Sequence, residues 1–271
     1  MAVEVRPFAA SLGAEIAGID LSQPVGAADR AALTRALGDH LALVFRDQAL
    51  TPEQYLSAAE VFGPPMRQHY SQHNMEDFPN IGLVWHRNGQ KPAEAWHTDH
   101  TNREKPPAAT ILYGVEIPSE GGGTSVANMR AAYLALPEAE RTKLRGLRTV
   151  NTLDDTHDDT RPEDVEKFGV PIVHPMVRTH PVHGSDAVYF HITKTKHIEG
   201  MTPADSRAYL QDLLDRIIEP GIAYTHQWRK GDVLVIDDRA TLHRAHGDYD
   251  RSESRVLWRI IVEGDRPILV Q

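Results

Sequence analysis

The sequence has no cysteine among its 271 residues, which excludes both a disulfide framework and a thiolate metal site. It also has no apolar run long enough to span a bilayer, and its first residues, MAVEVRPFAA, lack the charged-then-apolar pattern of a signal peptide. These absences predict a soluble protein of a reducing compartment, the cytoplasm.

An excess of basic residues is absent as well. The formal net charge is −9 and the isoelectric point about 5.9. Because binding to phosphate groups needs a basic face, we expect neither nucleic acid nor an anionic membrane as a partner. A local basic pocket for a small anion remains allowed. With 41% hydrophobic and 25% charged residues, the composition is that of a globular protein. The oligomeric state stays open, a homo-oligomer included.

Apolar periodicity and capping residues predict helices near both ends of the chain and in its middle. They cover residues 26–40, 51–63 (with Thr51 as N-cap and Pro52 first), 129–147 (broken at Pro137) and 201–220 (capped by Thr202). Strands are predicted within 41–47, 80–86, 108–118, 121–129, 223–238 and 255–264. No βαβ alternation is visible, so the expected architecture is a mostly antiparallel β-core with helices packed on it.

Residues 151–175, NTLDDTHDDTRPEDVEKFGVPIVHP, are acidic, polar and interrupted by proline. We interpret them as a long loop. Loops of such length in a compact domain are usually functional or mobile, so this segment is a candidate lid.

The stretch AWHTDHTN, residues 95–102, carries three side chains that can bind a metal: His97, Asp99 and His100. In an extended chain, residues two apart face the same side, so His97 and Asp99 can point inward together while Thr98 and His100 point away. One more histidine would complete the two-histidine, one-carboxylate set that leaves three positions open on an octahedral iron.

The best source of that third ligand is GDVLVIDDRATLHRAH, residues 231–246, in which an apolar strand precedes two histidines. His243 sits just past the strand, and His246 is its local rival. Spacing alone does not choose between them, and it does not establish that a metal is bound.

Several motifs in the same order resemble the taurine dioxygenase and 2,4-dichlorophenoxyacetate dioxygenase family of Fe(II)/2-oxoglutarate enzymes. They are LGAEIAGIDLSQP and LALVFRDQALTPEQYLSAAEVFG near the start, WHTDHTNREKPPAATILYGVEIPSEGGGTSVANMRAAYLALP in the centre, and VRTHPVHG, IEGMTPADSRAYLQDLL and WRKGDVLVIDDRATLHRAHGDYDRSESRVLWR towards the end. The resemblance implies one dioxygenase domain over residues 1–271, with a lid-like insertion at about 151–175. The implied fold is mostly β with packed helices around a jelly-roll, cupin-like double-stranded β-helix.

The resemblance also assigns residues. His97, Asp99 and His243 would bind Fe(II), and Thr124 and Arg255 would bind the distal carboxylate of 2-oxoglutarate. An arginine offers the forked, two-donor match that a carboxylate prefers.

The resemblance assigns substrate contacts as well. Arg259, four residues after Arg255, falls on the same strand face and would meet an anionic substrate. His100 and Asn102 make a more polar wall than relatives have, and His69 is a further candidate for the substrate. Asp238 stands where relatives often have asparagine.

The implied reaction uses O2 to convert 2-oxoglutarate to succinate and CO2 and to hydroxylate a small anionic substrate, with cleavage of a C–S, C–O or C–N bond or desaturation as further outcomes. Two alternatives from other classes remain: a zinc hydrolase using the same three ligands, and a non-catalytic β-barrel that binds a 2-oxo acid. The zinc alternative gives no reason for Thr124 and Arg255. The identity of the substrate is left open.

Overall fold

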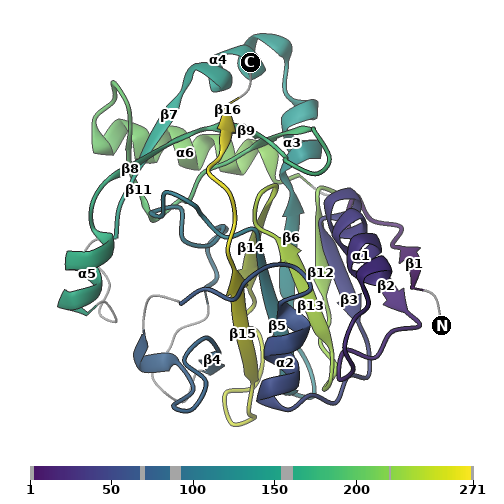
Figure 1. Cartoon of the computed structure of the whole chain (residues 1–271). Coiled ribbons are helices and arrows are strands. Elements are labelled where there is room, and N and C mark those ends of the chain that lie inside the picture. The colour runs from purple at the N-terminus through teal and green to yellow at the C-terminus, as the bar shows by residue number, and fades with distance from the viewer. Residues whose placement is uncertain (1–2, 68–70, 86–92, 154–160, 220, 270–271) are drawn as a thin grey trace.

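Two β-sheets pack against each other in the computed structural model, which describes residues 3–67, 71–85, 93–153, 161–219 and 221–269 (Figure 1). The major sheet has the strand order β1-β2-β3-β13-β5-β15-β4, and the minor sheet the order β12-β6-β14. The major strands are Glu4–Pro7, Ala14–Ala17, Ala42–Phe45, Val233–Asp237, Ala109–Glu116, Val256–Val262 and Gly82–Trp85 in that order, and the minor strands Ala223–His226, Thr124–Asn128 and Thr241–Ala245. This is the jelly-roll core that the sequence resemblance implies.

Alternating side chains of the major sheet enter two separate hydrophobic clusters. On β13, Leu234 and Ile236 join the cluster shared with the minor sheet, whereas Val233 and Val235 join a second cluster on the opposite face. Because both faces are covered, this strand is apolar from Val233 to Ile236, and periodicity alone does not show which of its side chains face the minor sheet.

Helices close the outer face of the major sheet. α1 (Ala27–His40) and α2 (Pro52–Ala59) contribute Leu33, Leu37 and Tyr55 to the second cluster. Thr51 forms the predicted cap of α2, because its side chain accepts from the Gln54 N–H while Gln54 returns a bond to the Thr51 N–H.

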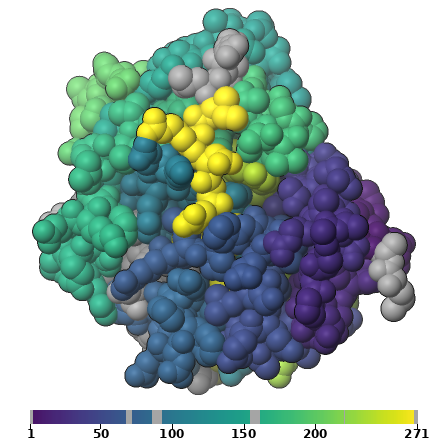
Figure 2. All heavy atoms as spheres, in the orientation of Figure 1, coloured from purple at the N-terminus to yellow at the C-terminus, as the bar shows by residue number. Residues whose placement is uncertain are grey.

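The remaining helices and short strands gather mostly at one end of the two sheets, at the top of Figure 1. The helices are α3 (Met129–Ala135), α4 (Glu138–Gly146) and α6 (Pro203–Ile217), joined by the small sheets β11-β7-β8 and β10-β9-β16. Their strands are Thr195–Ile198, Arg148–Asn151, Ile172–Pro175, Asp186–Val188, Val177–Thr179 and Ile268–Leu269. Figure 2 shows the C-terminal segment, in yellow, on the surface of the molecule. No helix among the described residues is long and apolar enough to cross a bilayer.

The expected helices are confirmed, with the break at Pro137 dividing α3 from α4 and Thr202 capping α6. One organisational prediction is wrong, because a βαβ unit is present. β2 runs parallel to β3, and α1 lies between them in the chain. The strand β2 is only four residues long, AEIA, so its local pattern gives little signal and its partners define it.

The prediction of one continuous loop over residues 151–175 is also wrong. α5 (Pro162–Phe168) and β8 occupy its second half, while residues 154–160 lie outside the described ranges. Pro162 fits the first turn of a helix, and Glu163 and Asp164 complement the positive end of its dipole. The polar composition that favoured a loop therefore belongs in part to a short exposed helix.

Candidate metal centre

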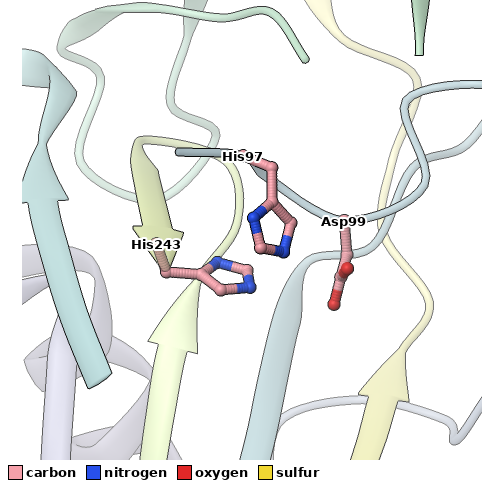
Figure 3. A group of neighbouring side chains, drawn as sticks. All are labelled: His97, Asp99 and His243. Atoms are coloured by element: carbon pink, nitrogen blue, oxygen red, sulfur yellow. The ribbon is translucent and has the colours of Figure 1, made fainter. Parts of the chain in front are cut away.

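His97, Asp99 and His243 are brought together from two distant parts of the chain (Figure 3). His243 lies on β14, and His97 pairs with it through two backbone hydrogen bonds of 2.7 and 3.0 Å. One ligand atom from each of the three side chains lies within 4.8 Å of the others. A single metal ion can therefore reach all three.

The local backbone explains why this short segment presents two ligands and not three. The His97 Nδ1–H donates to the Ala95 carbonyl at 2.8 Å, which leaves Nε2 to face Asp99 and His243. Thr98 turns the other way and donates to the Asp238 carbonyl at 2.8 Å. The alternation expected for an extended chain therefore holds across these three positions. It ends at His100, whose φ is +45°.

Burial sets the protonation of these ligands. It lowers the pKa of His97, and burial together with the nearby charge of His97 lowers the pKa of His243 to about 3. For Asp99, burial alone would raise the pKa, but Arg259 and the surrounding histidines hold it well below its usual range. Two neutral imidazoles and one carboxylate are the protonation states that a divalent metal requires.

A second carboxyl group, that of Asp238, is linked to Asp99 through the Thr110 hydroxyl. The Thr110 hydroxyl lies 2.8 Å from Asp99 Oδ2 and 2.7 Å from Asp238 Oδ2. Burial and the negative charge of Asp99 raise the pKa of Asp238 well above its usual range. A protonated Asp238 donates to Thr110, which then donates its own proton to Asp99.

Thr124 shares a sheet face with one of the metal-centre histidines, and Arg255 is bonded to Gly122, two residues before Thr124. Thr124 begins β6, and two residues further on Val126 pairs with His243, so Thr124 and His243 emerge on the same face of the minor sheet. Arg255 is 4% exposed, and its Nε donates to the Gly122 carbonyl at 2.7 Å. Among the described residues its Nη2 is buried without a hydrogen-bond partner, so this cationic donor can be offered to an anion.

Arg255 directly precedes β15, so the shared face of Arg255 and Arg259 stays a prediction. Leu257, halfway between them, packs into the cluster between the two sheets, whereas Trp258 packs on the outer cluster. Arg259 reaches inward, with its Nη1 3.8 Å from Asp99 Oδ1. The centre therefore has an arginine beside its carboxylate ligand.

The other sequence-predicted residues are placed as follows. His100 and Asn102 are both buried, and the Asn102 amide donates to the Phe168 carbonyl at the end of α5. His246, the rival ligand, instead bonds Ser125 Oγ through Nε2 at 2.7 Å. His69 lies outside the described residues.

Sequence reasoning missed two residues that border the centre. The His191 ring lies 5.6 Å from that of His97, and its Nδ1 accepts from the backbone N–H groups of Thr193 and Lys194. Lys194 is 8% exposed. Burial lowers the pKa of His191 well below its usual range, and the charges of His97 and Lys194 lower it further. The run FHITK carries no periodic signal for such a position.

Comparison with known proteins gives one consistent result. Residues 4–261 match the taurine catabolism dioxygenase TauD, TfdA family. The alpha-ketoglutarate-dependent 2,4-dichlorophenoxyacetate dioxygenase of Cupriavidus pinatubonensis is 29% identical, over 96% of this chain and 97% of that protein. The alpha-ketoglutarate-dependent sulfate ester dioxygenase of Pseudomonas putida is 32% identical, over 98% and 91%. The crystal structure of AAD-2 with Mn(II) and N-oxalylglycine superposes with a TM-score of 0.83 at 28% identity, with all of both chains covered.

Proposed function

Because this chain belongs to the TauD, TfdA family of dioxygenases and uses Fe(II), 2-oxoglutarate and O2, we propose that His97, Asp99 and His243 are the ligands of its iron. The observation that carries this assignment is the meeting of three ligand atoms within 4.8 Å of one another. Two imidazoles and a carboxylate form the facial set typical of non-haem Fe(II) oxygenases. The named relatives are oxygenases, which argues against the zinc hydrolase and the non-catalytic barrel.

Thr124 and Arg255 are proposed to hold the distal carboxylate of 2-oxoglutarate. The buried, unpartnered Nη2 of Arg255 supports this role, because a buried cationic donor is stable only when an acceptor completes it. Arg255 is fixed to the loop that carries Thr124 through its bond to Gly122. A guanidinium and a hydroxyl then offer two donors to one carboxylate.

When bound, iron and 2-oxoglutarate supply the oxidising chemistry: 2-oxoglutarate, O2 and a substrate C–H become succinate, CO2 and a C–OH. The chain's own part is to bind, orient and exclude water. Thr110 and Asp238 hold Asp99 in one orientation, and the Ala95 carbonyl fixes His97. Asp99 and His243 are buried, which keeps water away from these two ligands.

A small anionic substrate is supported by the positive side chains near the centre. Arg259 lies beside Asp99, and Lys194 is buried next to His191. Two cations near one carboxylate ligand attract a further anion, so Arg259 is proposed to bind the substrate's anionic group. The two named relatives act on anionic compounds, a phenoxyacetate and sulfate esters.

Further substrate contacts are proposed around the metal segment. His100 and Asn102 are proposed to form a polar wall, and His69 a further contact. Asn102 also ties the metal segment to α5, and Arg103 stacks on the Phe168 ring at 4.0 Å. We propose that α5 and the residues that follow it up to β8 close over the substrate.

The substrate class is tested by measuring succinate formed from 2-oxoglutarate and O2. Phenoxyacetates, alkyl sulfates, sulfonates and their neutral amide or alcohol analogues are compared with the uncoupled background. Anionic compounds are expected to raise succinate release, and Arg259→Gln should abolish the difference between anionic compounds and their neutral analogues. A panel in which a neutral compound alone couples would overturn the role of Arg259.

Two broader expectations are also proposed, action in the cytoplasm and a single domain over residues 1–271, while the oligomeric state, a homo-oligomer included, stays open. Light scattering of the purified protein measures the last directly.

A further inference from the structure

The indole of Trp228 touches the proposed cosubstrate site without belonging to it. Its Nε1–H donates to Thr124 Oγ1 at 3.0 Å, and both side chains are buried. Trp228 follows β12, whose last residue, His226, pairs with Thr124 across the minor sheet. An indole nitrogen can only donate, so this contact uses the acceptor side of the Thr124 hydroxyl and leaves the Thr124 proton for another acceptor.

A buried polar chain holds Trp228 in this position. The His226 ring lies edge-on to the indole, with centroids 4.6 Å apart at 89°. His226 Nε2 donates to Asp232 Oδ2 at 3.1 Å, and its Nδ1 bonds the Tyr224 hydroxyl at 3.1 Å. Because both nitrogens of His226 are engaged, its ring cannot rotate freely and the indole has a fixed neighbour.

The strand on the other side also leaves space for the indole. A Cβ at Gly114 would lie 3.2 Å from Trp228 Cε3 and 3.0 Å from the Arg229 carbonyl. Gly114 lies at a register shift between β5 and β15. The close approach of this backbone to Trp228 supports an indole held by packing on one face and by a hydrogen bond at its edge.

We propose that Trp228 is a positioning residue for the cosubstrate: by donating to Thr124 Oγ1, it directs the Thr124 O–H toward the distal carboxylate of 2-oxoglutarate. A hydroxyl that accepts one hydrogen bond is polarised into a better donor of the next. Trp228 thereby contributes to the preference for 2-oxo acids that carry a second carboxylate. This inference rests on the proposed roles of Thr124 and Arg255.

The test uses two ligands that differ only at the distal group: 2-oxoglutarate, and 2-oxovalerate, in which a methyl replaces that carboxylate. Their Kd values are measured by calorimetry on the Mn(II)-loaded protein, so no turnover is involved. Trp228→Phe keeps the ring and removes the donor. It is expected to raise the Kd of 2-oxoglutarate by about two- to tenfold, the value of one hydrogen bond, and to leave that of 2-oxovalerate unchanged.

A double-mutant cycle locates the effect. In a Thr124→Val background, Trp228→Phe is expected to change the Kd of 2-oxoglutarate no further, because the bond it removes is already absent. Trp258→Phe is the matched control, since Trp258 packs on the outer cluster with Tyr55 and Tyr113, and it should leave both Kd values unchanged. Unaltered Mn(II) affinity and Tm show that each variant is folded.

Two results would overturn the positioning role of Trp228. One is an equal rise in Kd for both acids, which indicates general loss of packing. The other is a full effect of Trp228→Phe in the Thr124→Val background. Failure of the proposed function looks different, because the unmodified protein would then fail to prefer 2-oxoglutarate over 2-oxovalerate, and that result overturns both proposals.

Discussion

Replacing Asp238 with asparagine should remove a distinctive pH dependence from the stability of the metal-free protein. Asp238 is 1% exposed, shares the Thr110 hydroxyl with Asp99, and has a pKa raised well above its usual range by burial and by the charge of Asp99. The folded protein therefore retains one proton that the unfolded chain releases near pH 4. Asparagine has a similar shape and can donate to Thr110 in the same way.

This single proton sets the direction and the size of the change in unfolding free energy with pH. A group whose folded pKa is raised contributes stability that is fully present below its unfolded pKa and is lost as pH rises through its folded pKa. Between the unfolded and the folded pKa of Asp238, the free energy of unfolding of the unmodified protein should fall by about 1.4 kcal/mol per pH unit relative to that of Asp238→Asn. Urea unfolding of both proteins at intervals from about pH 5 upward measures the difference, provided that unfolding is reversible.

The neighbouring Asp237 provides the matched control. Burial would raise its pKa, but the paired Arg239 and the bond from His180 hold that pKa below its usual range. Its contribution is present above the unfolded pKa and lost only in acid, so Asp237→Asn should cost about 3–5 kcal/mol with no added slope above roughly pH 7, where its partner His180 no longer titrates. A flat difference between Asp238→Asn and the unmodified protein would refute a protonated Asp238.

Three other predictions follow from single contacts. His243→Ala should weaken Mn(II) binding in calorimetry by more than the roughly 10- to 100-fold that loss of an outer partner costs, whereas His246→Ala should not change it; equal losses would contradict the ligand assignment. Gly122→Ala should raise the Kd of 2-oxoglutarate by about tenfold, because the added Cβ would lie 3.0 Å from Arg255 Cδ and the φ of residue 122 is +66°. An unchanged Kd would show that Gly122 does not hold Arg255 in place. Asn102→Ala should speed hydrogen exchange in α5 by about fivefold, the effect of losing about 1 kcal/mol of local stability, and no change would show that the bond does not anchor the helix.

Local sequence rules were sufficient where the determinants are local. The caps at Thr51 and Thr202, and the alternation that turns His97 and Asp99 to one side, depend on neighbours within a few residues. The inward packing of Leu257 likewise follows from the alternation along β15.

Determinants that lie far away in the sequence could not be found in this way. Residues alone left His243 and His246 open, because the choice depends on which of them pairs with His97 across the fold. The role of Trp228 was not identified from the sequence for the same reason, because its contact with Thr124 depends on the register of β12 against β6. The helix α5 was missed because its surface is polar and its length is under two full turns.

The most direct test of the iron and cosubstrate assignment is an anaerobic titration of the metal-free protein with Fe(II) and 2-oxoglutarate, followed by visible absorption. The account predicts a metal-to-ligand charge-transfer band that is lost in His97→Ala and His243→Ala, that persists in His246→Ala, and that needs more 2-oxoglutarate to saturate in Arg255→Gln. Absence of the band in the unmodified protein, or its survival in His243→Ala, would contradict the account.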